Sequence, residues 1–266
     1  MMEKEYAALG LRYEFFDDLM NDLMDATEGN HFTAPGYEGV AAYQDPSGPR
    51  LCAFKSADGW QVNPGFRGDF SARASAFRIN EFLLHIDLHR LHDDEIFASF
   101  AAASDEAFAV LGGSPVTKDR LRVDDAQISA WATDFQLYDS LADWQDSDDS
   151  FVSGTAGHER RVPALLYSPS TEQFHQNLSP RGVHPYAHLS GELASADKRT
   201  NALTGQDFYV CGINTPAGGL SLLLPANASS KNGANPTAGM VFEGTVLVSA
   251  SVGFWDRYDL PTSQPG

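Results

Sequence analysis

Hydrophobic and polar residues alternate along much of the chain, and this period of two predicts a mainly β protein. Residues 38–44, 49–56 and 59–63 read as short strands, because the sequences DPSG and ADG between them are typical of turns. Residues 82–89 alternate most clearly, and we expect one face of that strand to be buried and the other exposed. The apolar face carries Phe82, Leu84, Ile86 and Leu88, and the other face carries Leu83, His85, Asp87 and His89.

The clearest helical pattern lies in residues 11–25, where large apolar side chains recur every four residues among acidic ones. We expect one amphipathic helix there, ending before Gly29. An apolar stripe this wide normally packs on the protein's own core, and docking on a partner is the alternative. The stripe consists of Leu11, Phe15, Phe16, Leu19, Met20 and Leu23.

The C-terminal half repeats the strand pattern of the first half. Strand candidates occupy residues 184–199, 206–215, 220–225 and 240–255, and Gly244 and Gly253 stand where a strongly curved strand bends. Short strands with glycine kinks fit a small closed barrel of the OB type. A similar order of strands and turns runs through residues 66–138. The predicted fold is therefore mainly β, with two OB-like small β-barrels in tandem and an N-terminal amphipathic helix.

The predicted domain organisation follows from these patterns and from the length of 266 residues, of which 42% are hydrophobic, enough for two cores. Residues 1–30 form the N-terminal helix and residues 31–140 the first β-barrel domain. Residues 141–180, which include the polar sequence DWQDSDDS, form a linker and connecting segment. Residues 181–258 form the second β-barrel domain, and residues 259–266 form a tail.

The second predicted barrel carries the sequence RTNALTGQDF ahead of the strand YVCGINT. In these residues the chain resembles a group of conserved hypothetical bacterial proteins of unknown function, in which an RTNxLTGxxF hairpin precedes a glycine-containing strand. The resemblance extends over residues 44–255, rests on turn motifs, and implies an OB-like C-terminal barrel without implying an activity. The terminal strand departs from the group, since it reads LVSASV where a segment containing tryptophan is expected. We interpret TNALTG as turn chemistry.

The charge of the chain limits its partners. Thirty-six acidic residues against eighteen Lys and Arg give a formal net charge of −18, so this is an acidic protein. Nucleic-acid affinity comes largely from Lys and Arg that neutralise phosphates, and the sequence contains no cluster of them. The sequence therefore argues against nucleic acid and against a membrane surface, and it leaves a protein partner or a small molecule. The oligomeric state is not predicted.

The cysteines and the N-terminus indicate the compartment. Cys52 and Cys211 lie in apolar runs, which is typical of buried thiols in a reducing environment. No run of about 18 apolar residues is present. The first residues, MMEKEYAALG, carry acids where a signal peptide has a basic start. We therefore expect a cytoplasmic protein.

The sequence HIDLHRLHDDE is the strongest candidate for chemistry, because it carries His85, Asp87, His89 and His92. On a strand, alternate side chains project about 7 Å apart, so they meet at one cation only if the strand curves or a neighbour contributes. On a helix, the three histidines share a face, but the alternation favours a strand. Zinc or another divalent metal at these four residues is the cofactor hypothesis that the sequence offers. The alternative is an exposed polar face, with no cofactor expected.

Other motifs add little to this assignment. Residues 195–198, SADK, match S-x-x-K, but the companion motifs of acyl-transfer enzymes are missing. The sequence contains no G-x-S-x-G, G-x-G-x-x-G, P-loop or C-x-x-C motif. We therefore expect a non-enzymatic binding or interaction module built on tandem OB-like barrels, because the sequence favours such a module over an enzyme. The alternative is a metal-assisted hydrolase that uses His85, Asp87, His89 and His92.

Overall fold

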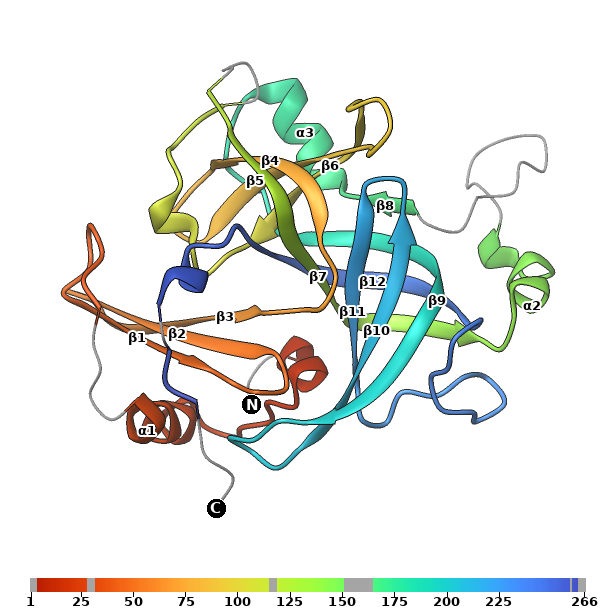
Figure 1. The fold of residues 1–266 in the computed structure, drawn as a ribbon, viewed down its shortest axis with the longest axis horizontal. Helices are drawn as coiled ribbons and strands as arrows, with labels where there is room; N and C mark the ends of the chain where they lie inside the picture. Colours follow the sequence, from red (N-terminus) through yellow and green to blue (C-terminus); the bar gives the residue numbers. More distant parts are fainter. Residues whose placement is uncertain (1–3, 28–31, 115–118, 151–164, 259, 263–266) are drawn as a thin grey trace.

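The strands of the protein form two sheets (Figure 1). The structure is a computed structural model that describes residues 4–27, 32–114, 119–150, 165–258 and 260–262. A three-stranded sheet has the order β1-β2-β3, and a nine-stranded sheet has the order β10-β11-β7-β4-β5-β6-β12-β9-β8. The prediction of a mainly β protein is confirmed. The strands are β1 (Gly39–Gln44), β2 (Pro49–Ser56), β3 (Gly59–Phe66), β4 (Ala72–Arg78), β5 (Leu83–His89), β6 (Ile96–Ala103), β7 (Leu121–Tyr138), β8 (Leu165–Tyr167), β9 (Tyr186–Thr200), β10 (Asp207–Thr215), β11 (Gly218–Pro225) and β12 (Val241–Ser251).

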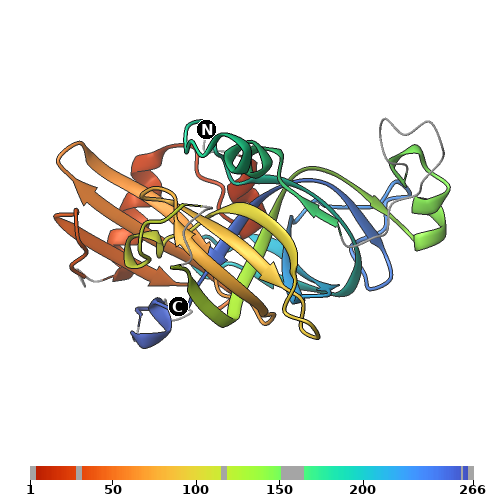
Figure 2. The ribbon, with the colours of Figure 1, turned by 90° about the horizontal axis from the view of Figure 1, so that it is seen from above.

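The helical elements are short and lie outside the sheets. Seen from above, the teal helix α3 lies over one side of the large sheet (Figure 2). The 3-10 helix η2 follows β6 after three residues, so the sequence EIFASFAAASDEAFAVLGG contains a strand and a short helix. The helical elements are η1 (Lys4–Leu9), α1 (Phe16–Thr27), η2 (Ala107–Ala109), α2 (Leu141–Gln145), η3 (Asp148–Ser150), α3 (Pro169–Asn177) and η4 (Trp255–Arg257).

The pairings in the large sheet close two rings that share strands β7 and β12. The first ring runs β4-β5-β6-β12-β7 and returns to β4, with one parallel contact where Ala103 of β6 meets Ser249 of β12. The second ring runs β7-β12-β9-β10-β11 and returns to β7, with one parallel pairing between β11 and β7. Both shared strands are long, 18 and 11 residues, so each contributes different residues to the two rings.

A glycine on β12 and a bulge on β7 shape the pairing of the two shared strands. A Cβ on Gly244 would lie 2.4 Å from the carbonyl oxygen of Asp134 in β7, so only glycine allows this close approach. The register of β12 on β7 shifts directly afterwards, between Thr245 and Val246. Thr245 faces Asp134 and Val246 faces Ala132, so the extra residue of this bulge is Thr133 on β7, and the bulge bends that strand. On β12 the alternation continues without a break, and Phe242, Val246 and Val248 all enter the main core.

One hydrophobic core runs through both rings. It contains Leu84, Ile86 and Leu88 from the first ring and Cys211 and Leu222 from the second. The apolar face predicted for residues 82–89 is therefore confirmed for the three residues of β5. Both cysteines are buried and unpaired, as expected from their apolar surroundings.

The three-stranded sheet packs between two further clusters. One face, with Tyr43 and Leu51, lies against the N-terminal segment and the outer side of the second ring. The other face, with Cys52 and Phe54, packs on aromatic residues that include Trp255. The sheet is therefore attached to the rings on one side and closed by the C-terminal segment on the other.

The N-terminal helix packs on its own protein, which confirms the intramolecular interpretation of its apolar stripe. Leu19 and Leu23 of α1 are fully buried. Phe15 and Phe16 of the predicted stripe require a correction, because they are 61% and 42% exposed. The helix begins at Phe16, so Phe15 precedes the first helical turn and does not share the helical face.

The nine-stranded sheet contains strands from both predicted barrel domains, so it continues across the predicted boundary between them. Strands β1 to β7, expected in one barrel over residues 31–140, are divided between the two sheets. Strand β7 pairs along its C-terminal half with β12, which lies in the predicted second domain, residues 181–258. The predicted connecting segment, residues 141–180, contributes α2, η3, β8 and α3, and its residues 151–164 lie outside the described residues. Parts of the predicted N-terminal unit and of the tail also lie outside them.

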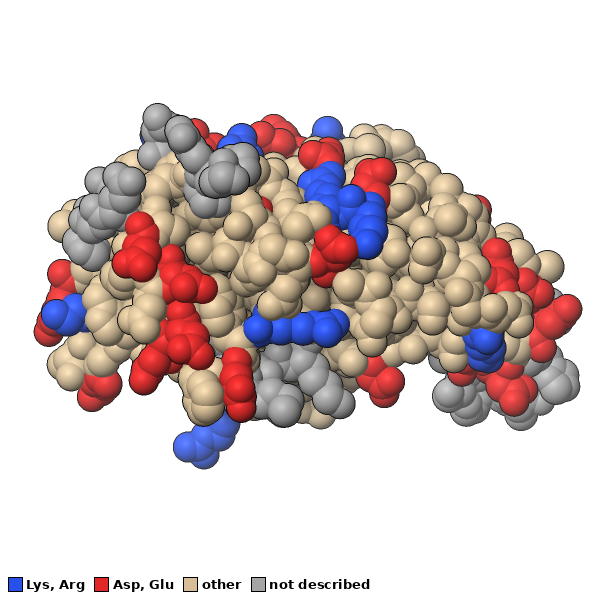
Figure 3. Space-filling view, turned by 90° about the horizontal axis from the view of Figure 1, so that it is seen from below, with Lys and Arg blue, Asp and Glu red and all other residues tan. Residues whose placement is uncertain are grey.

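Acidic side chains gather toward both ends of the face drawn in Figure 3. One group lies on the left, where α1 lies in Figure 1, and another lies on the right, while the Lys and Arg side chains between them have acidic neighbours. The exposed carboxylates of α1 are Asp17, Asp18, Asp22 and Asp25. Among the described residues, no helix is long and apolar enough to cross a membrane.

Candidate functional site

The structure brings together two of the four residues predicted to bind a metal. His85 and Asp87 project from β5 away from the core, and His85 Nε2 lies 2.9 Å from Asp87 Oδ1. Both side chains are buried, 0% and 1% exposed as residues, which corrects the expectation of an exposed polar face. Helix α3 and the Arg120 side chain cover this side of the strand: the His85 ring contacts His175 of α3, and Arg120 pairs with Asp87.

The other two predicted residues have partners of their own. His89 Nε2 lies 2.9 Å from the hydroxyl of Ser75, and its Nδ1 lies 3.1 Å from the carbonyl oxygen of Asp94. His92 lies beyond the end of β5 with its side chain 71% exposed, 2.8 Å from Asp93. Within the described ranges, no three His, Cys, Asp or Glu side chains are arranged to hold a metal ion. The four-residue cluster predicted from the sequence is therefore not assembled.

The environment of His85 keeps its imidazole neutral. Burial lowers the pKa of His85 to about 3, and the nearby Arg120 guanidinium acts in the same direction. The Asp87 carboxylate also accepts a hydrogen bond from the Ser99 hydroxyl, at 2.6 Å. Protonating this imidazole at neutral pH is unfavourable, which makes His85 a poor general base for the hydrolase alternative.

A second buried polar cluster joins the three-stranded sheet to the rings, and the sequence patterns did not reveal it. Arg50 of β2 is 1% exposed and forms a two-pronged ion pair with Asp105, with Nε–Oδ2 at 2.5 Å and Nη2–Oδ1 at 2.9 Å. Its Nη2 also lies 3.0 Å from Glu106 Oε1 and 3.3 Å from the hydroxyl of Ser251. We call Arg50, Asp105, Glu106 and Ser251 the arginine network.

Backbone groups complete the arginine network. Glu106 Oε2 accepts hydrogen bonds from the backbone N–H groups of Val252 and Phe254, at 2.6 Å and 3.3 Å. The Ser251 hydroxyl donates to Glu106 Oε1 at 2.6 Å. These contacts hold the chain after β12 in place, and they position the turn that leads to Trp255.

The pKa shifts in the arginine network follow from burial and from the ion pair. Burial alone lowers the pKa of Arg50, but Asp105 and Glu106 more than offset it and raise that pKa above its ordinary value. Burial raises the pKa of Glu106, and Arg50 opposes the shift. Burial and the neighbouring Asp105 raise the pKa of the Cys52 thiol, which donates to Asp105 Oδ2 at 3.2 Å. Cys52 is therefore a protonated hydrogen-bond donor, not a nucleophile.

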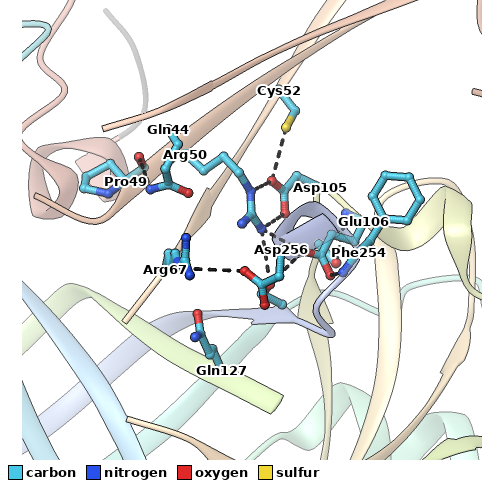
Figure 4. Close-up of polar contacts among 12 residues, drawn as sticks. Gln44, Pro49, Arg50, Cys52, Arg67, Asp105, Glu106, Gln127, Phe254 and Asp256 are labelled. Atoms are coloured by element: carbon cyan, nitrogen blue, oxygen red, sulfur yellow. Dashed lines mark hydrogen bonds and ion pairs between the residues drawn. The ribbon is translucent and has the colours of Figure 1, made fainter. Parts of the chain in front are cut away.

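A cavity of about 140 Å³ lies beside the arginine network. Figure 4 shows the Arg50 guanidinium at the edge of the space between Gln44, Arg67 and Asp256. The four hydrogen bonds of Arg50 in the arginine network come from Nε and Nη2, so its second amino nitrogen, Nη1, takes no part in that network. We call this space the Arg50 cavity; its lining residues are Gln44, Arg50, Arg67, Trp255, Asp256, Tyr258, Leu260 and Thr262.

The remaining polar groups of the Arg50 cavity are partly occupied. Arg67 Nε lies 3.7 Å from Asp256 Oδ1, and both side chains are about half exposed, at 57% and 44%. The Gln44 amide nitrogen donates to the carbonyl oxygens of Asp45, Gly48 and Pro49. Trp255 is 2% exposed, and its indole N–H finds no partner within the described part of the chain. The indole N–H of Trp255 is therefore a buried donor without an acceptor beside this cavity.

One sequence signal points to the arginine network. Arg50 stands in the apolar run PRLCAF, and Asp105 and Glu106 interrupt the apolar run FAAASDEAFAV. A charge inside a buried strand requires a counter-charge, so an arginine and a carboxylate pair isolated in apolar runs are candidates for each other. Arg50 and Asp105 are 55 positions apart in the sequence, so no local pattern indicates that they pair.

Comparison with protein-family models, with curated proteins and with solved structures gives no significant match for this chain. The assignment of function therefore depends on the geometry of the two buried clusters and of the Arg50 cavity.

Proposed function

We propose that this protein is a non-enzymatic binding protein that holds a small carboxylate or inorganic oxyanion in the Arg50 cavity. The observation that carries the proposal is the donor lining of the cavity: the buried Arg50 side chain, whose Nη1 takes no part in the arginine network, and the buried indole N–H of Trp255, which has no partner among the described residues. A buried N–H group without an acceptor loses a hydrogen bond that water provides in the unfolded chain. A ligand with acceptor oxygens restores that bond.

The size and charge of the Arg50 cavity support a small ligand. At about 30 Å³ for each water molecule in the liquid, the cavity of about 140 Å³ has room for a molecule of a few non-hydrogen atoms. Arg67 supplies a second guanidinium at the rim and is held only loosely, 3.7 Å from Asp256. Two guanidinium groups that meet one anion form charge-assisted hydrogen bonds, which are stronger than those of neutral donors. The ligand replaces Asp256 as the partner of Arg67.

We also propose that both rings are OB-like barrels. The order of the first ring, β4-β5-β6-β12-β7, with its parallel contact between the third and fifth strands, is the strand order of an OB barrel. The second ring has the same order with its start shifted by one strand: β9, β10, β11 and β12 take the first four positions and β7 the fifth. The tandem barrels predicted from the sequence thus become two barrels that share two strands.

The outer faces on which OB barrels bind nucleic acid are covered by this chain itself. That face is formed by the second and third strands of an OB barrel. On β5 and β6 of the first ring, α3 covers it, with the Thr171 hydroxyl accepting a hydrogen bond from the Ala101 N–H at 2.8 Å. On β10 and β11 of the second ring, Phe208 and Leu223 pack against the N-terminal segment. Together with the net charge of −18, this supports a small ligand in place of a nucleic acid.

The test is calorimetric titration of the full chain with a panel of sodium phosphate, sulfate, acetate, oxalate and citrate at low ionic strength. The proposal expects at least one of these anions to bind with a stoichiometry of one. Arg67→Gln removes a rim donor without disturbing the buried network, and we expect it to weaken binding by about 10- to 150-fold, since a hydrogen bond to a charged group contributes about 1.5–3 kcal/mol.

Arg122→Gln is the matched control, because Arg122 is an exposed arginine that pairs with Asp94 away from the Arg50 cavity. It should leave the affinity unchanged. The proposal is wrong if no anion of the panel binds, or if Arg67→Gln and Arg122→Gln affect binding equally. Equal effects would indicate a general response to net charge.

A further inference from the structure

We propose that His85 and His175 form a two-histidine site for zinc or a similar divalent transition metal. His85 projects from β5, and His175 lies on the exposed side of α3. Their ring centroids are 4.9 Å apart, with an angle of 51° between the ring planes. This pairing was not among the sequence hypotheses, because 90 residues separate the two histidines along the chain.

The hydrogen bonding of His85 matches the pattern of a metal-binding histidine. Metal-binding histidines use one ring nitrogen for the metal and donate the other N–H to a carboxylate or carbonyl. In His85, Nε2 lies 2.9 Å from Asp87 Oδ1, while Nδ1 is buried and has no partner among the described residues. Asp87 is fixed in turn by the Ser99 hydroxyl and by Arg120. Asp87 thus takes the role of an orienting carboxylate, not of the direct ligand that the sequence hypothesis assigned to it.

The ring separation fits two imidazoles on one metal. Zinc binds imidazole nitrogen at about 2.0–2.1 Å, so two rings on a tetrahedral zinc have centroids about 5 Å apart. The observed 4.9 Å agrees with that separation. Phe77 stacks on the His85 ring with centroids 4.6 Å apart and fixes its plane, whereas His175 is exposed and adjusts by rotating its side chain.

The charges around the pair permit a cation of modest affinity. Arg120 is positive and lowers the pKa of both histidines, so it opposes a cation there, and its ion pair with Asp87 reduces this opposition without removing it. The described residues offer two protein ligands at this place, and water completes the coordination on the exposed side of His175. Zinc and copper are favoured over magnesium or calcium, because imidazole nitrogen is a poor ligand for the latter pair. His89 and His92 take no part in this site.

The experiment uses the full chain, treated with a chelator and then dialysed, and titrates it with zinc chloride alone by calorimetry at pH 7.5. We expect one zinc per chain. His175→Ala changes an exposed helix position, so the fold is retained, and the loss of a direct ligand should weaken zinc binding by at least about tenfold, the lower bound for losing even an orienting partner. His92→Ala removes an exposed histidine outside the site and should leave the affinity unchanged.

A second readout reports the ligating atoms. In ¹⁵N NMR of the histidine side chains, zinc should shift the Nδ1 resonance of His85 and one ring nitrogen of His175, and no resonance of His92. The inference is overturned if the full chain binds no zinc, or if His175→Ala binds zinc as tightly as the unaltered chain. The second result would assign the binding to surface carboxylates. Neither outcome involves the Arg50 cavity, so this test is independent of the proposed anion binding.

Discussion

Replacing Arg50 by methionine tests whether the arginine network holds the two sheets together. Arg50 is 1% exposed, and its removal leaves the carboxylates of Asp105 and Glu106, both 0% exposed, without their cation. Breaking a buried ion pair by removing one partner costs about 3–5 kcal/mol. A loss of 1 kcal/mol lowers the melting temperature of a chain of about this size by roughly 2–4 °C, so we expect a decrease of about 6–20 °C.

The loss should depend on pH in a defined direction. Burial already raises the pKa of Glu106, and Arg50 opposes that shift, so removing Arg50 raises the pKa further. Because the folded pKa then lies above the unfolded value, the folded state of the variant binds a proton more tightly than the unfolded state. Its stability therefore increases as the pH falls through the folded pKa, and the difference from the unaltered chain should be smaller at pH 5 than at pH 8.

Urea unfolding followed by tryptophan fluorescence measures both quantities. Lys55→Met is the matched control: Lys55 also lies on β2, but its pair with Glu38 is about half exposed, and its loss should cost less than 1 kcal/mol. The triple variant Arg50→Met, Asp105→Asn, Glu106→Gln removes the unpaired charges and should regain most of the stability. A loss below 1 kcal/mol for Arg50→Met, or a loss that is the same at pH 5 and pH 8, would refute this account of the network.

Two further predictions concern packing. Leu23→Ala in α1 removes a fully buried side chain and should cost about 2–5 kcal/mol in urea unfolding, whereas Phe15→Ala, at a side chain 61% exposed, should stay within about 0.5 kcal/mol; equal losses would contradict the packing of the helix. Gly65→Ala places a Cβ 2.7 Å from Asp105 Oδ1 and should cost about 1–3 kcal/mol, while Gly39→Ala meets no atom within 4 Å and serves as its control. A stable Gly65→Ala variant would show that Asp105 moves freely.

The sequence predicted the elements whose signal is local. Alternation over residues 82–89 correctly predicted β5 and its buried face, because a period of two is a property of the strand itself. The apolar stripe correctly predicted that α1 packs on the protein. The exposed side chains of Phe15 and Phe16 are errors of that prediction, and both lie where the helix begins, a position that spacing alone does not show.

The sequence did not predict features that depend on distant segments. The polar face of β5 was expected to be exposed, but α3 and Arg120 cover it, and neither lies near β5 in the sequence. Arg50 and Asp105 meet for the same reason, through the packing of one sheet on another. The sharing of β7 and β12 between two rings could not be predicted either, because the periodicity of a strand does not show which strands it pairs with.

The shared strand β12 affects how the chain reaches its folded state. The first ring begins with β4 at Ala72, but it closes only when β12, Val241–Ser251, has been synthesised. The second ring also closes only after β12 has been synthesised, because β12 pairs with β9 in that ring. Until then β6, β7 and β9 present unpaired edges, and such edges recruit other chains when they persist. Assembly in the cell is therefore a late and concerted event, with most of the contacts formed between residues far apart in the sequence and with slow folding as the result.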